Sequence, residues 1–201
     1  MSKRLASGLA NAGWTPNQIS VVGVCAALLA GIAFGLTSVV PGWARLWFLF
    51  GAVLVQVRLL ANMLDGMVAV ETGQASPVGE LYNEVPDRVS ATLILVGLGY
   101  AAGGSVTLGW AAAVAAVLTA YVRAQAAVAG APQEFCGPMA KPQRMFLITV
   151  VAIYCVVTPA SWQPVTEGGY GIAAACTLVV FAGSVATAAR RLVRSGRALG
   201  R

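Results

Sequence analysis

The stretch that decides the fold is Asn62–Asp87, with the sequence NMLDGMVAVETGQASPVGELYNEVPD, and apolar segments flank it on both sides. Five of the chain's seven acidic residues lie in it: Asp65, Glu71, Glu80, Glu84 and Asp87. Carboxylates are costly at membrane depth, so a cluster of them between two membrane spans indicates a functional site. We therefore interpret the rest of the chain as a scaffold for this stretch.

The composition predicts an integral membrane protein. Of its 201 residues, 58% are hydrophobic and only 10% are charged, whereas a soluble domain carries about 25% charged residues. At roughly 25 to 30 residues for each span and its connection, the length allows about six helices. We expect a single all-α domain over 1–201, a polytopic bundle of six transmembrane helices with a short N-terminal interfacial helix.

Turn residues and polar breaks divide the apolar chain into segments. Residues 1–14 predict the short interfacial helix, and Thr15 and Pro16 form a helix start, with Thr15 as N-cap. The GxxxG of Gly31 and Gly35 permits close helix approach, inside the bundle or at a dimer face. The six expected spans cover about 17–38, 43–70, 78–102, 106–129, 142–160 and 169–189.

The basic residues predict the orientation of the helices. With a cytoplasmic N-terminus, only Arg45 falls on the outer side. The cytoplasmic side holds Lys3, Arg4, Arg88, Arg123, Lys141, Arg144 and the five arginines of a basic tail after residue 189. We expect both termini on the cytoplasmic side of a bacterial inner membrane, with the acidic stretch open to the cytoplasm. The net charge of +6 does not indicate a nucleic-acid partner, because the basic residues flank apolar segments and meet lipid headgroups there.

The chain has no histidine. This excludes histidine acid–base catalysis, the Ser-His-Asp triad and the usual zinc sites. Side chains three or four residues apart share a helix face, so the acidic stretch presents oxygen ligands from two helices to one pocket. Oxygen ligands without histidine or cysteine indicate Mg²⁺ or Mn²⁺. The candidate ligands are Asn62, Asp65, Glu80, Asn83, Glu84 and Asp87.

The same residues resemble the motif of the CDP-alcohol phosphotransferases, D-x2-D-G-x2-A-R-x8-G-x3-D-x3-D. This chain reads Asn62-x2-Asp65-Gly66-x2-Ala69-Val70-x8-Gly79-x3-Asn83-x3-Asp87, so every spacing matches and five of the eight defined positions are identical. Three weaker similarities to the family lie at Thr15–Asn17, at Tyr121–Arg123 and at 137–144, GPMAKPQR.

The resemblance implies transfer of a substituted phosphoryl (phosphatidyl) group from a CDP-linked lipid or alcohol donor to an alcohol or polyol phosphate, with release of CMP, in phospholipid biosynthesis. It implies catalytic roles for Asp65 and Asp87, a Mg²⁺ or Mn²⁺ cofactor, and a homodimer among membrane lipids. It also implies nucleotide contacts at Asn17, Gly66, Ala69 and Gly79. The acceptor phosphate would lie against Arg58, Arg123, Lys141 and Arg144.

Three motif positions depart from the family pattern. Asparagine replaces aspartate at Asn62 and Asn83, which lowers the formal charge of the motif from −4 to −2, and Val70 replaces arginine. Glu80 and Glu84 could restore the missing charge. Arg58 needs a partner at membrane depth, and Glu80, Glu84 or a phosphate could provide it. The alternatives are a catalytically impaired family member that acts as a membrane scaffold or ligand-binding protein, a polar vestibule, and a transporter.

Overall fold

The computed structural model describes residues 2–73 and 77–200, and their side chains except those of residues 2, 3, 77–83 and 160. All the regular structure in these residues is helical. The helices are α1 (Ser2–Asn11), α2 (Pro16–Val39), α3 (Ala44–Glu71), α4 (Pro77–Gly99), α5 (Val106–Val128), α6 (Lys141–Val157) and α7 (Ile172–Leu199), with short 3-10 turns at Pro41–Trp43 and Ala160–Trp162.

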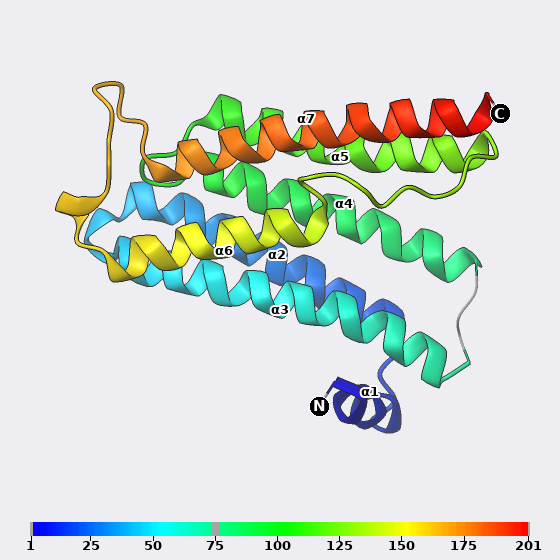
Figure 1. Cartoon of the computed structure of the whole chain (residues 1–201). Helices are drawn as coiled ribbons and strands as arrows, with labels where there is room; N and C mark the ends of the chain where they lie inside the picture. Colours follow the sequence, from blue (N-terminus) through cyan, green and yellow to red (C-terminus); the bar gives the residue numbers. More distant parts are fainter. Residues whose placement is uncertain (1, 74–76, 201) are drawn as a thin grey trace.

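Helices α2 to α7 lie side by side, and each runs opposite to the one before it (Figure 1). The connections after α2, α4 and α6 lie at one end of this bundle. The end of α3, the start of α4, the connection after α5 and the end of α7 lie at the other end. Helix α1 lies across that second end, below α3. The second end therefore gathers the acidic stretch and most of the basic residues, as the charge pattern predicts.

Four helices in the described part of the chain are long and apolar enough to cross a membrane: α2, α3 with the turn before it, α5 and α7. Helix α6 has 17 residues, which span about 26 Å against a hydrocarbon core of about 30 Å. Helix α4 carries charged residues in its first half. The all-α membrane fold is confirmed, and the count of six spans stays a prediction.

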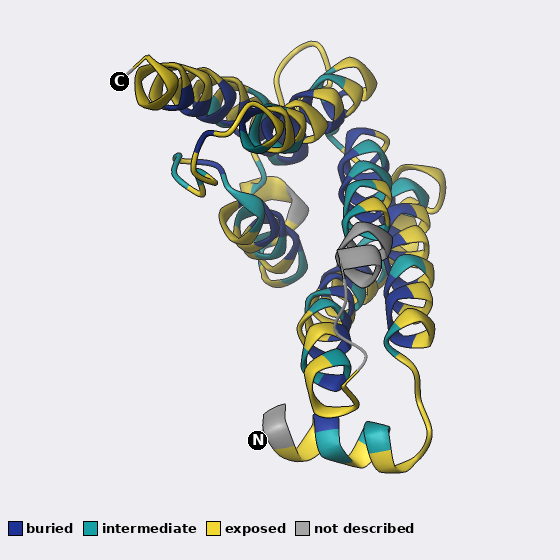
Figure 2. Cartoon of the chain, turned by 90° about the vertical axis from the view of Figure 1, so that its right-hand side faces the viewer, coloured by how far each residue is buried: buried dark blue, intermediate teal, exposed yellow. Residues whose placement is uncertain are grey.

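The outward surface of the bundle is apolar. Leu28 and Ile32 on α2 and Phe50 and Val53 on α3 are all exposed, and in the end-on view the exposed faces of the helices point outward (Figure 2). Exposure of so much apolar surface to water would be unfavourable, whereas contact of this surface with lipid tails is not. The surface therefore fits a bundle that is surrounded by lipid.

Glycine contacts bring α2 and α4 together. A Cβ atom on Gly97 would overlap the backbone of Gly31, and one on Gly35 would lie 3.8 Å from Tyr100. Small residues at such a crossing let two backbones approach closely. The GxxxG of α2 therefore packs inside the bundle, and the alternative of a dimer face is not needed to explain it.

The helix start at Thr15 is confirmed. Its side chain accepts from the Gln18 N–H, and the Gln18 side chain accepts from the Thr15 N–H, which is a capping box. Before it, α1 packs on α3 through Ala6, which is fully buried in a cluster with Ile19 and Leu64. The expected short N-terminal helix is therefore present and fixed against the bundle.

The last helix extends beyond residue 189, where the sixth expected span ends. Helix α7 continues to Leu199, because the residues after 189 are mostly good helix formers. Two of them, Arg191 and Ser195, also turn toward the bundle and are buried. The basic residues after 189 therefore lie on nearly three further turns of a packed helix.

Candidate active site

A cavity of about 340 Å³ opens between α4, α5, α6 and α7, and Phe135 and Ala140 of the connection from α5 to α6 also line it. Five cationic side chains line it: Arg88, Arg123, Lys141, Arg144 and Arg191. Two carboxylates, Glu84 and Asp87, lie on the wall that α4 forms. The excess of positive charge makes this a site for an anionic ligand.

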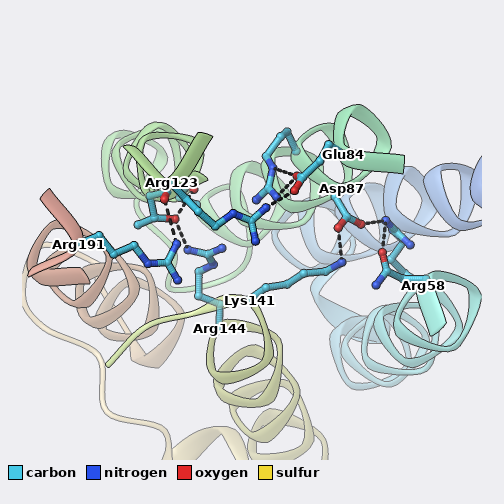
Figure 3. A network of polar contacts seen from close by, with 11 residues as sticks. Arg58, Glu84, Asp87, Arg123, Lys141, Arg144 and Arg191 are labelled. Carbon is cyan, nitrogen blue, oxygen red and sulfur yellow. Dashed lines mark hydrogen bonds and ion pairs between the residues drawn. The ribbon is translucent and has the colours of Figure 1, made fainter. Parts of the chain in front are cut away.

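Asp87 is held by cations on both of its carboxylate oxygens. Oδ1 pairs with Arg58 of α3, and Oδ2 lies 2.6 Å from Nζ of Lys141 at the start of α6. Figure 3 shows both cationic side chains converging on this carboxylate. Asp87 thus joins three helices, and its side chain keeps 15% of its surface exposed.

Glu84, one turn before Asp87, is also paired twice. It accepts hydrogen bonds from Arg88 on the same helix and from Arg123 on α5. Its side chain is 43% exposed, so solvent screens these pairs more than those of Asp87. The two carboxylates therefore neutralise Arg88, Arg123 and Lys141 in part.

Arg144 and Arg191 hold the inner part of the cavity and are bound by neutral oxygens. Arg144 is 1% exposed, and its Nη1 donates to the backbone oxygen of Met139 at 3.2 Å. Further acceptors of this nitrogen are Thr119 Oγ1 and Ser184 Oγ. Nε of Arg144 is buried without a hydrogen-bond partner. No carboxylate of the described side chains forms an ion pair with either arginine, so this pair suits a phosphate.

Arg191 links α7 to the connection between α5 and α6, which forms the roof of the cavity. It donates to the backbone oxygens of Thr119 and Cys136, both at 2.9 Å. The roof is also held by Arg123, whose guanidinium lies 5.1 Å from the ring centre of Phe135. Contacts of this kind fix a connection that would otherwise move freely.

Glu134 adds a second tie between the roof and α7. Its carboxylate lies 3.4 Å from Nη1 of Arg194. A hydrogen bond from the Cys136 thiol, together with Arg194, lowers the pKa of Glu134 below its usual value. Glu134 therefore stays ionised at neutral pH and keeps its attraction for α7.

Asp65 lies on α3 and is buried to 2% exposure. One carboxylate oxygen accepts from Ser20 Oγ at 2.8 Å, and the other accepts from the Gly66 N–H at 2.7 Å. Asn62, one turn earlier, accepts from Nη2 of Arg58 at 3.4 Å. Ser20 is a contact that the sequence analysis missed.

The oxygen donors suit a hard divalent cation only in part. Asp65 and Asn62 share a face of α3 and supply oxygens of the right chemistry, but both oxygens of Asp87 already bind cationic nitrogens. Among the described side chains there is no group of three or more His, Cys, Asp or Glu residues that could hold an ion. The described donors fit one cation at Asp65 better than an ion at Asp87.

A second pocket of about 340 Å³ lies between α3 and α6, next to the cavity. It shares Lys141 and Pro142 with the cavity, and Leu59 and Phe146 give it an apolar wall. Asn62 lines it on the side toward the acidic stretch. The polar site therefore adjoins an apolar groove on the face between α3 and α6.

The structure brings most of the predicted site residues to this end of the bundle. Asp87, Glu84, Arg123, Lys141 and Arg144 line the cavity, and Arg58 reaches its edge. Arg58 has the anionic partner that its depth in the bundle requires. That partner is Asp87, whereas the sequence suggested Glu80, Glu84 or a phosphate. The antiparallel packing of α3 and α4 places Asp87 and Ser90 beside Arg58. Glu80, Asn83 and Gly79 lie outside the residues whose side chains the structure describes.

The predicted nucleotide contacts lie apart from the cavity. Asn17 lines a separate hollow of about 570 Å³ with Trp14 and Val21. Gly66 is exposed, with open space where a Cβ would lie, and Ala69 on the same helix is half-buried. Their nucleotide roles stay predictions.

Two cavity cations, Arg191 and Arg88, were not assigned to the site from the sequence. Arg191 had been interpreted as an orienting charge of the tail. A signal was present, since Ser184, Thr187 and Arg191 recur on one face of an otherwise apolar helix and all three are buried. Polar residues at that spacing in a membrane helix indicate an inward-facing site.

Two curated proteins with similar sequences are named as synthases of inositol phosphate lipids. The archaetidylinositol phosphate synthase of Pyrococcus horikoshii is 27% identical over 157 residues, 77% of this chain and 78% of that protein. The phosphatidylinositol phosphate synthase of Mycobacteroides abscessus is 26% identical over 174 residues, 84% of this chain and 70% of that protein.

Solved structures confirm the fold. The phosphatidylinositol phosphate synthase of Mycobacterium tuberculosis, in complex with manganese and citrate, superimposes with a TM-score of 0.77 at 20% identity, covering 98% of this chain and 89% of that chain. The same protein with CDP-DAG bound gives a TM-score of 0.71, also at 20% identity, covering 99% and 93%. The family model for CDP-alcohol phosphatidyltransferase matches residues 14–188, and the chain thus belongs to this family of membrane transferases.

Proposed function

We propose that this protein transfers a phosphatidyl group from CDP-diacylglycerol to a phosphorylated polyol, with release of CMP, in phospholipid biosynthesis. The observation that carries the proposal is the cationic cavity with Asp87 on its wall. An anionic acceptor would be attracted by the arginines, and its hydroxyl would need a base. With no histidine in the chain, the carboxylate of Asp87 is the candidate base, because aspartate is ionised at neutral pH without giving up a proton first.

The acceptor phosphate would bind Arg144 and Arg191, with Arg123 nearer the roof. Arg144 supports this role because it is buried, and its Nε lacks a partner. Burial of a guanidinium is costly unless an anion or a set of hydrogen bonds compensates it. A phosphate monoester supplies both, and it would place the polyol toward Asp87.

The donor would enter from the lipid phase through the groove between α3 and α6. The apolar wall of Leu59 and Phe146 suits an acyl chain, and the groove meets the cavity at Lys141. The relative from Mycobacterium tuberculosis has been solved with CDP-DAG bound. The diphosphate would then lie between Asp65 on α3 and Asp87 on α4, with Gly66 leaving room for it.

In the transfer, the acceptor oxygen bonds to the phosphorus that carries diacylglycerol, the bond from that phosphorus to the bridging oxygen breaks, and CMP leaves. Asp87 accepts the proton of the acceptor hydroxyl. Mg²⁺ or Mn²⁺, when bound, neutralises the charge of the diphosphate. Asp65 would be its main ligand with Asn62, and Asn83, Glu80, Glu84 and Asp87 remain the other predicted ligands.

We further propose that α4 and α6 also span, so that the single domain crosses the bacterial inner membrane six times with both termini in the cytoplasm. The positive-inside bias supports this orientation, and it gives the cavity access to cytoplasmic nucleotides and metal ions. A homodimer is expected from the family resemblance.

The alternative of a catalytically impaired scaffold is disfavoured. The family is one of transferases, and Asp87 lies on the wall of the cationic cavity. A scaffold would have no need to bury Arg144 beside Thr119 and Ser184.

The test is CMP release from CDP-diacylglycerol in mixed micelles by purified protein, with Mn²⁺ or Mg²⁺ and a panel of polyols and polyol phosphates. We expect release with phosphorylated polyols only, and its loss in Asp65→Ala and Asp87→Ala. Arg45→Met, which removes a side chain bound to Thr158 O at the opposite end, is the matched control and should remain active. Folded protein that releases no CMP with any acceptor would refute the proposal and favour the scaffold.

A further inference from the structure

Arg58 connects the two halves of the acidic stretch. It lies on α3 at 2% exposure, and its Nε donates to Ser90 Oγ on α4 at 2.7 Å. Its Nη2 donates both to Asn62 Oδ1, at 3.4 Å, and to Asp87 Oδ1. One nitrogen thus bridges oxygens at two motif positions on two helices, as Figure 3 shows for its approach to Asp87.

The guanidinium of Arg58 is a cation that bridges an oxygen of Asn62 on α3 and an oxygen of Asp87 on α4. A divalent ion between α3 and α4 would need the oxygens of Asn62 and Asp87, and Arg58 already binds one oxygen of each. Lys141 binds the other oxygen of Asp87 at 2.6 Å. Displacing Arg58 from both oxygens would leave its charge buried without an anionic partner, which is strongly unfavourable.

The charge balance points the same way. A motif with four aspartates carries −4, which offsets two divalent cations. Here positions 62 and 83 are asparagine, so the four motif positions carry −2, and Arg58 brings their total to −1. Glu84 does not add to this total, because Arg88 and Arg123 already pair with it, and Glu80 lies outside the described side chains. One divalent cation leaves this site at +1, whereas two would leave it at +3. Such an excess of positive charge is strongly unfavourable in a buried site.

We propose that Arg58 takes the place of a divalent cation between Asn62 and Asp87, so that the chain binds a single metal ion, at Asp65. This rests on the proposed function, since it concerns the same site. A guanidinium suits the task because its planar fork holds a fixed positive charge and binds phosphate oxygens in two directions.

A free donor group on Arg58 supports a role toward the substrate. Nη1 is buried without a hydrogen-bond partner. It faces α2 at Gly23, where an added Cβ would lie 3.1 Å from it. The absence of a side chain at Gly23 thus lets Arg58 pack closely against α2. A diphosphate oxygen of the donor would give Nη1 the acceptor that it lacks. Arg58 would then stabilise charge on the leaving CMP, as arginine clamps do in phosphoryl transfer.

The test counts bound Mn²⁺ per chain by equilibrium dialysis with metal analysis, and records the electron paramagnetic resonance spectrum of the bound ions in detergent. The wild-type chain should bind one Mn²⁺ at saturation and give the spectrum of an isolated ion. The double variant Arg58→Met/Asn62→Asp removes the cation and adds a carboxylate, so it should bind two ions with a spectrum broadened by their coupling. Arg45→Met should bind one, like the wild type.

A wild-type count of two, or of zero, would overturn the proposal, as would a double variant that folds by circular dichroism and still binds one ion. The wild-type count needs no variant, so misfolding of the double variant leaves the proposal open to refutation. The counts do not depend on CMP release. A chain with one ion and no CMP release would contradict the proposed function while supporting the placement of Arg58.

Discussion

Glu84 on α4 pairs with Arg123 on α5 across the mouth of the cavity, while its second carboxylate oxygen holds Arg88. The carboxylate thus lowers the positive charge that an acceptor would meet near the roof. Arg144 and Arg191 lie deeper, on neutral oxygens. We infer that Glu84 disfavours acceptors with more than one phosphate, because its negative charge repels the additional phosphate.

Glu84→Gln is therefore expected to shift acceptor choice. The ratio of kcat/KM for a polyol bisphosphate over a polyol monophosphate should rise about tenfold, because one negative charge leaves a partly screened site. Glu71→Gln, at an exposed residue bound to Ser7, is the control. An unchanged ratio would refute this interpretation, and a parallel fall in Mn²⁺ affinity would instead support Glu84 as a metal ligand.

Arg144→Met should weaken binding of the acceptor phosphate. Loss of a charge-assisted hydrogen bond costs about 1.5 to 3 kcal/mol, so we expect KM for the polyol phosphate to rise between about tenfold and a hundredfold. The KM of Arg144→Lys should lie between those of the wild type and Arg144→Met, because an ammonium keeps the charge but lacks the planar fork of a guanidinium. Arg190 lies on α7 next to Arg191 and is exposed, so Arg190→Met should leave KM for the polyol phosphate unchanged. Steady-state kinetics with thermal unfolding of each variant would separate lost binding from lost stability.

Ser20→Ala should weaken metal binding. The hydroxyl of Ser20 donates to Asp65 Oδ2 at 2.8 Å, and removal of a group that orients a metal ligand typically costs 10- to 100-fold in affinity. We expect about a tenfold rise in the Mn²⁺ dissociation constant by dialysis. Ser38→Ala removes a hydroxyl of the same helix that binds the backbone oxygens of Gly35 and Tyr100, and its Mn²⁺ affinity should match the wild type. Equal affinity in both variants would place the ion away from Asp65.

Gly97→Ala tests the packing of α2 on α4. The new Cβ would overlap the backbone of Gly31, and overpacking of this kind costs about 1 to 3 kcal/mol. We expect the midpoint of thermal unfolding to fall by about 5 °C. Gly196→Ala on α7 meets nothing within 4 Å and should be neutral or slightly stabilising. If both variants unfold together with the wild type, the close approach of α2 and α4 is absent in the membrane.

Local patterns predicted the helices well. Hydropathy and turn residues placed the long helices within a few residues, apart from the end of α7, because apolar runs and turn residues are local features. The capping box at Thr15 is a contact over three residues and is local for the same reason. The last turns of α7 extend beyond the apolar run, so hydropathy alone does not include them, and the burial of Arg191 and Ser195 depends on the packing of α7.

By itself, the sequence determined that this is a helical membrane protein of the CDP-alcohol phosphatidyltransferase type, because the motif spacing is a property of two adjacent helices. Only the tertiary structure decided which charges meet. Arg58 binds Asp87, and Glu84 binds Arg123. Arg191 lines the same cavity as Asp87, although the two residues are more than a hundred positions apart in the sequence. Helical periodicity fixes the face on which a side chain lies, but its partner depends on how antiparallel helices are offset along their axes and rotated about them.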